Sequence, residues 1–167
     1  DYQLYFLDSE SGEVTAAPAV DGWVEYFHWS PSGDAIVLGV AGHGADVSGG
    51  QGGVTSKKGA DASESWMPII DTGDEDFRWR SAWVYDLRTQ VVKQVSPEGL
   101  NTWEVNWCGD SQLVAVTSLA PGEGGWYSAT LSIIDVATGN VRTLYTPKDQ
   151  LGWPSASSCG KHVAIVE

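Results

Sequence analysis

Hydroxyl and imidazole groups are the first candidates for chemistry in this sequence of 167 residues, but their spacing does not suit nucleophilic catalysis. Residues 109–113 read Gly-Asp-Ser-Gln-Leu, which lacks the second glycine of the Gly-x-Ser-x-Gly turn of many hydrolases. His28, His43 and His162 have no serine or cysteine placed for activation, and a nucleophile needs a base within hydrogen-bond reach. The sequence therefore predicts no catalytic residue in this chain.

Cysteine and glycine patterns likewise predict no metal site and no cofactor. The two cysteines, Cys108 and Cys159, form no Cys-x-x-Cys pair, and no histidine pair has the spacing of zinc ligands. Two free thiols in a reducing compartment are favoured over a disulfide, which favours the cytoplasm. The glycines of residues 49–53 lack the strand-to-helix context of a phosphate-binding loop.

One acidic cluster is the candidate binding site. Asp74, Glu75 and Asp76 are adjacent, and Arg78 and Arg80 follow them. The three carboxylates could bind a cationic group or Ca²⁺, although their spacing differs from that of an EF-hand loop. A solvated acidic turn that pairs with the two arginines is the alternative. These five residues are the predicted substrate-binding residues.

The overall charge narrows the classes of partner. Nine lysines and arginines against 22 acidic residues give a net charge of −13. Nucleic acids and anionic membrane surfaces are therefore excluded as partners, because both require cationic side chains. No apolar run reaches the roughly 18 residues of a membrane-spanning helix.

The elements that would position these groups come from an internal repeat. Each repeat has an apolar run ending in an aspartate that opens a turn, and 21 residues later a second turn precedes another apolar run. The matched aspartates are Asp8, Asp86 and Asp135, and the matched starts of the second segment are Trp29, Trp107 and Ala156. Steps of 78 and 49 residues separate the copies, so the repeat carries an insertion at about residues 41–81.

Each copy has the composition of about four short strands joined by tight turns. Asp-x-x-Thr-Gly and Ser-Pro-Ser-Gly are turn sequences, and the run from 35 to 40 is typical of a buried strand. We therefore predict an all-β fold over residues 1–167: a partial β-propeller of about three four-stranded blades from a larger ring. Closed propellers have about four to eight blades, so the rest of a ring or a second copy of the chain is expected to cover the open sheet edges.

Two sets of residues are predicted to pack inside this fold. The first set occupies a common register after the second turn, in three triplets: Ile36, Val37 and Leu38; Val114, Ala115 and Val116; Val163, Ala164 and Ile165. The second set consists of Trp23, Trp103 and Trp153, which precede the matched second segments and are predicted to fill the space between blades. Trp66, Trp79 and Trp126 lie outside the repeat, so a ligand contact stays open for them.

The apolar run followed by Asp-x-x-Thr-Gly, together with Trp-Ser-Pro-Ser-Gly-Asp-Ala-Ile-Val at 29–37, resembles the propeller of prolyl-oligopeptidase-family serine peptidases. The dipeptidyl-peptidase and acylaminoacyl-peptidase branches are the most similar, and the blade motif is shared with propellers of the Tol system. The resemblance implies that the chain gates or positions peptide substrates for an α/β-hydrolase domain of the same protein. It also implies capture of a substrate amino terminus by propeller carboxylates, although Asp74, Glu75 and Asp76 form no Glu-Glu motif. The alternative is a non-enzymatic, Tol-like propeller that acts as a binding or scaffold module.

Overall fold

The computed structural model describes residues 2–43, 45 and 79–167, which form twelve strands and one short helix. The first six strands are β1 (Tyr5–Leu7), β2 (Val14–Ala16), β3 (Trp23–Trp29), β4 (Ala35–Ala41), β5 (Arg80–Asp86) and β6 (Val91–Gln94). The others are β7 (Asn101–Cys108), β8 (Gln112–Ser118), β9 (Thr130–Asp135), β10 (Val141–Tyr145), β11 (Gly152–Ala156) and β12 (Val163–Val166), and the helix is α1 (Glu123–Tyr127).

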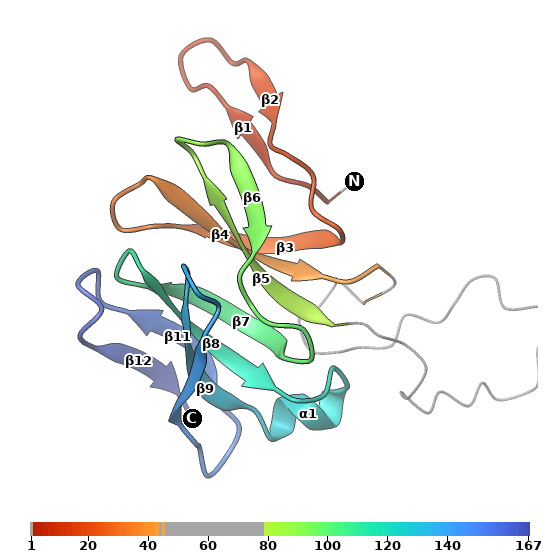
Figure 1. Cartoon of the computed structure of the whole chain (residues 1–167), viewed down its shortest axis with the longest axis vertical. Helices are drawn as coiled ribbons and strands as arrows, with labels where there is room; N and C mark the ends of the chain where they lie inside the picture. Colours follow the sequence, from red (N-terminus) through yellow and green to blue (C-terminus); the bar gives the residue numbers. More distant parts are fainter. Residues whose placement is uncertain (1, 44, 46–78) are drawn as a thin grey trace, which may run out of the picture.

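The strands form four antiparallel sheets that follow one another through the molecule (Figure 1). Two sheets are complete four-stranded meanders, β3-β4-β5-β6 and β7-β8-β9-β10. The pairs β1-β2 and β11-β12 form two-stranded sheets at opposite ends of the arrangement (Figure 1). The expected three blades are therefore present as two whole sheets and two half sheets.

The position of the aspartate turn explains why the end sheets are halves. Asp86 joins β5 to β6 and Asp135 joins β9 to β10, so this turn connects the third and fourth strands of a complete sheet. Asp8 makes the same connection between β1 and β2, which are therefore the third and fourth strands of a unit. Strands β11 and β12 correspond to the first and second strands.

The three aspartate turns share one hydrogen-bond pattern, as the sequence predicts. In each turn one carboxylate oxygen accepts the backbone N–H three residues on, at 2.6 Å from Ser11, 2.9 Å from Thr89 and 2.8 Å from Thr138. The fourth residue after each aspartate has positive φ: Gly12 at 74°, Gln90 at 57° and Gly139 at 71°. These hydrogen bonds lower the pKa of Asp8, Asp86 and Asp135, with the bonds from Ser11, Thr89 and Thr138 as the largest causes.

Hydrophobic clusters join each sheet to the next. Leu4 packs with Ile36 and Leu38 between the first two sheets. The second interface contains Val37, Val84, Val95, Val105, Leu113 and Ile134. The third contains Trp103, Val116, Leu131, Leu151 and the partly buried Ile165. The sheet β7–β10 is thus covered on both faces, which accounts for the buried side chains along β8.

The predicted buried triplets are confirmed in β4 and β8 and are wrong in part in β12. The first two triplets are at most 1% exposed, whereas Val163 and Ile165 are half-buried and Ala164 is exposed. Strand β12 pairs only with β11 among the described residues, so one side of it stays open. The register of β8 also differs by one residue from the predicted one. In β4, Ile36 pairs with Tyr85, the residue before Asp86. In β8, the residue that pairs with Ile134, directly before Asp135, is Leu113 and not Val114.

The helix α1 was not predicted from sequence, because its residues Glu-Gly-Gly-Trp-Tyr include two glycines, which disfavour helices.

The two cysteines are free, with Cys108 buried and Cys159 exposed. Burial raises the pKa of the Cys108 thiol. At the insertion, the Gly42 N–H donates to the Trp79 carbonyl at 2.9 Å, so the pairing of β4 and β5 extends beyond both strands.

Gly39 in β4 provides the space in which the ring of Tyr26 lies. The two residues are directly paired across β3 and β4, and a Cβ at position 39 would overlap the Tyr26 ring. The substitution Gly39→Ala is expected to destabilise the fold by about 1–3 kcal/mol, the usual range for overpacking. Urea denaturation would measure this. Gly122→Ala is the matched control because nothing lies near its added Cβ, and equal effects of the two substitutions would contradict the packing argument.

Candidate binding cleft

The structure describes one of the five predicted substrate-binding residues. Asp74, Glu75, Asp76 and Arg78 lie outside the described residues, so their role stays a prediction. Arg80 is described, and it is the first residue of β5 with only 2% of its side chain exposed.

Arg80 joins neighbouring sheets from a buried position. Its Nε lies 2.9 Å from Oε2 of Glu25 on β3, and its Nη2 donates to Oε1 of the same carboxylate at 3.0 Å. Its backbone N–H donates to Oδ1 of Asn101 on β7 at 2.6 Å, and its guanidinium carbon lies 5.5 Å from the ring centroid of Trp103. Because Glu25 is only 6% exposed, this two-point ion pair is shielded from solvent. Arg80 therefore fixes the junction of β3, β5 and β7.

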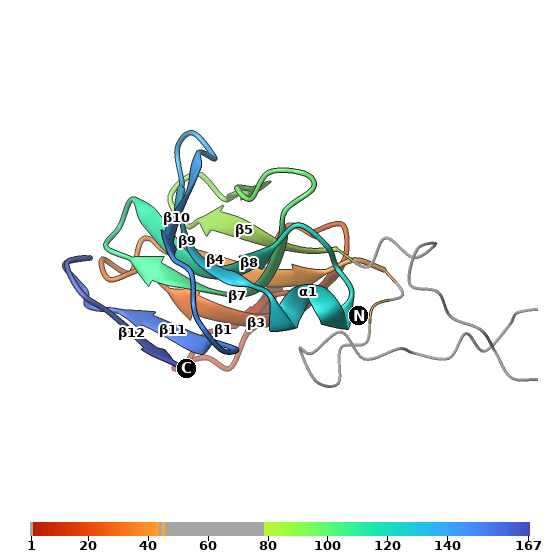
Figure 2. The same ribbon diagram turned by 90° about the horizontal axis from the view of Figure 1, so that it is seen from below.

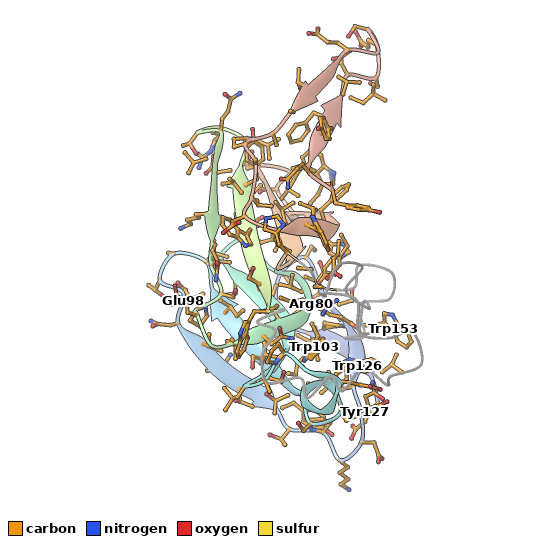
Figure 3. The ribbon with its side chains drawn as sticks, turned by 90° about the vertical axis from the view of Figure 1, so that its right-hand side faces the viewer. Arg80, Glu98, Trp103, Trp126, Tyr127 and Trp153 are labelled. Carbon is orange, nitrogen blue, oxygen red and sulfur yellow. The ribbon has the colours of Figure 1, made fainter. Side chains whose placement is uncertain are left out.

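A cleft of about 800 Å³ lies along the first strands of three successive sheets. Strand β7 contacts both β3 and β11, and Figure 2 shows β3 and β11 on the side of the molecule opposite β9 and β10. Side chains at the cleft come mainly from these first strands and from α1: Tyr26, His28, Trp103, Glu104, Asn106, Trp126, Trp153 and Ser155. Figure 3 shows Trp103, Trp126 and Trp153 gathered near α1, below Arg80.

Glu104 connects the two strands that border the cleft. Its Oε2 accepts the backbone N–H of Trp153 at 2.5 Å, across the gap between β7 and β11. The other oxygen, Oε1, accepts no hydrogen bond from the described residues, and a Cβ on Gly152 would lie 3.3 Å from it. Burial raises the pKa of Glu104, and the hydrogen bond from Trp153 opposes this by lowering it.

Trp153 has an unusual backbone conformation and an exposed ring. Its φ is 53°, in the left-handed region that bulky residues rarely adopt. The pairing of β11 with β12 is irregular at this point, between Gly152 and Ser155. As a result the side chain turns outward and is 74% exposed at the cleft. The predicted packing role is therefore confirmed for Trp103, which is 1% exposed, and is wrong for Trp153.

The lining suits binding rather than proton transfer. It combines aromatic rings, one carboxylate and the amides of Asn106 and Gln150, and the lining residues of the described part include no lysine or arginine. Partial burial lowers the pKa of His28, which keeps the imidazole neutral at pH 7. Its side chain makes no hydrogen bond to a described residue.

A second cleft of about 630 Å³ lies between the turns of the two complete sheets and contains Asp34, Asp86, Asp110 and Asp135. Asp86 and Asp135 hold their own turns, and Asp110 Oδ1 accepts the Ser32 N–H at 2.9 Å, which joins two neighbouring turns. The described residues contain no group of three histidine, cysteine or acidic side chains that could hold a metal ion. Three of the four aspartates, Asp86, Asp110 and Asp135, therefore stabilise turns through their side chains.

Comparison with known proteins identifies the fold. No protein-family model and no curated protein sequence matches the chain. TolB from Acinetobacter baumannii has a similar structure, with a TM-score of 0.58 and 16% sequence identity over 99% of this chain. The chain is a partial β-propeller. A TolB-like propeller from Agrobacterium tumefaciens has a TM-score of 0.50 and 15% identity over 89% of the chain.

The propeller alignments cover only part of the known structures. This chain spans 32% of the Acinetobacter protein and 42% of the Agrobacterium protein. The similarity bears out the expected β-propeller and gives no support to the prolyl-oligopeptidase family. Within the described residues, no helix has the length and apolar character needed to cross a membrane.

The binding cleft itself was not predicted from the sequence. The sequence allows a ligand contact for Trp126, and Trp126 does line the cleft. Glu104 and Trp153 were missed, since they come from two different units and meet only through the packing of β7 against β11. No local pattern around either residue distinguishes it from its equivalents in the other units.

Proposed function

We propose that this chain is part of a non-enzymatic β-propeller that binds a partner in the cleft between β3, β7 and β11. The observation that carries the proposal is the conformation of Trp153, whose ring is 74% exposed on a backbone with φ of 53°. Such a conformation costs on the order of 1–3 kcal/mol, and residues of this kind cluster at functional sites. An exposed indole gives little packing energy in return, so a ligand contact is the better explanation.

The similarity to TolB propellers supports the non-enzymatic class, because neither protein is named for an enzymatic activity. The propeller portion of a serine peptidase is the other class that the sequence predicts. In that case a hydrolase domain outside these residues would carry the Ser-Asp-His triad, with Gly-x-Ser-x-Gly preceding the aspartate and the histidine. No contact in the cleft favours this class over the first.

Peptide selection tests the proposed binding role. Random dodecapeptides displayed on phage would be selected on the immobilised protein, and the recovered peptides would be assayed on two variants. Trp153→Ala is expected to weaken their binding at least tenfold, because a tryptophan that anchors an interface contributes more than about 1.4 kcal/mol to binding. Trp29→Ala is the matched control, since Trp29 is also exposed (51%) but does not line the cleft.

Two results would contradict the proposal. Peptides that bind the Trp153→Ala variant as tightly as the native protein would place the binding surface elsewhere. Turnover of an aminoacyl chromogenic substrate by the purified chain, blocked by a serine-directed phosphonate, would show that the chain is an enzyme.

A further inference from the structure

We propose that the cleft receives a cationic side chain, a lysine ammonium or an arginine guanidinium, from a partner polypeptide. Glu104 is the counter-ion, and Trp153 and Trp126 supply the aromatic faces. This inference rests on the proposed binding function and specifies the chemistry of its ligand.

The charges around the cleft favour a cation. Among the described residues that line the cleft, Glu104 is the acidic one, and none of them is a lysine or arginine that could neutralise it. The nearby guanidinium of Arg80 is already paired at two points with Glu25. The whole chain carries a net charge of −13, which attracts cationic partners from a distance and repels anionic ones.

The geometry of Glu104 leaves one oxygen for a ligand. Oε2 is fixed by the Trp153 N–H at 2.5 Å, and Oε1 has no donor among the described residues. Gly152 keeps the approach to Oε1 open, because any larger residue would place its Cβ within 3.3 Å of this atom. An ammonium or guanidinium group would provide Oε1 with a donor and would also compensate the charge of this half-buried carboxylate.

The aromatic rings favour an organic cation over a metal ion. Trp153 is exposed, Trp126 is half-buried, and both line the cleft with Glu104. Indole faces attract lysine and arginine groups through the ring quadrupole and also cover the aliphatic part of these side chains. A metal ion would instead need several oxygen, nitrogen or sulfur ligands, and no such group of three exists among the described residues.

Three peptides that differ in one side chain test the ligand class. The peptides are acetyl-Ser-Gly-X-Gly-Ser-amide, in which X is lysine, arginine or norleucine, and binding is followed by tryptophan fluorescence and by indole N–H NMR shifts. The lysine and arginine peptides are expected to bind at least tenfold more tightly than the norleucine peptide at pH 7.5 and low salt. Added salt is expected to reduce this difference, because ions screen the charge interaction.

A charge-neutral variant isolates the role of Glu104. Glu104→Gln retains a carbonyl oxygen to accept the Trp153 N–H but removes the charge, so lysine-peptide binding is expected to fall to the norleucine level. Norleucine-peptide binding is expected to be unchanged. Glu98→Gln is the control, because Glu98 is exposed and does not line the cleft.

The outcomes separate this inference from the proposed function. If the three peptides bind equally and Trp153→Ala still weakens them, the cationic ligand is wrong and the binding role stands. If Glu104→Gln weakens the norleucine peptide as much as the lysine peptide, Glu104 positions Trp153 and is not a counter-ion. If no peptide binds and the phage selection also recovers none, both proposals are wrong.

Discussion

Substituting Glu25→Ala is expected to lower the free energy of unfolding by about 3–5 kcal/mol, because the buried Arg80 guanidinium would lose both of its hydrogen bonds to the Glu25 carboxylate. Both side chains are largely shielded from water, with 2% of Arg80 and 6% of Glu25 exposed. Equilibrium denaturation in urea, followed by far-UV circular dichroism, would measure the change. This effect should be among the largest of any single substitution in the chain, since the pair connects β3 to β5 next to the junction with β7.

A double variant separates the loss of the pair from general damage to the core. Glu25→Met combined with Arg80→Met removes both charges, and replacement of a buried ion pair by apolar residues is often neutral. We therefore expect the double variant to recover much of the stability that Glu25→Ala loses. The exposed control Glu98→Ala should change stability by less than about 0.5 kcal/mol. A loss below about 1 kcal/mol for Glu25→Ala would contradict the shielded ion pair.

Substituting Trp103→Ala is expected to cost about 3–5 kcal/mol of unfolding free energy, the usual range for removing a buried tryptophan. The ring is 1% exposed and lies in the cluster between the sheets β7–β10 and β11–β12. Its indole N–H also donates to the Ser118 hydroxyl at 2.8 Å, and this hydrogen bond would be lost.

Trp29→Ala provides the comparison within the same residue type. Trp29 is 51% exposed, so its removal is expected to cost less than about 1 kcal/mol. Thermal unfolding of the two variants under identical conditions would measure the difference. Equal losses would mean that Trp103 does not fill the space between the sheets as the structure indicates.

Features set by local chemistry could be predicted from the sequence. The turns at Asp8, Asp86 and Asp135 depend on a carboxylate that bonds its own backbone, and the structure shows this bond in all three turns. The hairpin formed by β9 and β10 follows from two apolar runs around the third turn, and in it Ile134 pairs with Val141. Repetition of these turns also predicted the propeller blades.

Features set by contacts between units could not be predicted. Trp103 and Trp153 precede equivalent segments, yet one is buried and the other exposed, since the irregular pairing in β11 turns Trp153 outward. The burial of Arg80 depends on Glu25, which lies 55 residues earlier in the sequence. The one-residue difference in register arises because the turn between β7 and β8 is shorter than the turn between β3 and β4. An alignment of the repeats on Trp29 and Trp107 does not reveal this difference.

The unequal coverage of the sheets links ligand binding to local stability. Strand β7 belongs to a sheet packed on both faces, whereas β11 belongs to the two-stranded sheet at the end of the arrangement. In a repeat protein the stability of each unit depends on its contacts with the neighbouring units, and β11 packs against β7 and β8. A ligand held between these strands would bind only when β11 is in place, and it would therefore shift the opening equilibrium of β11 and β12 toward the closed form.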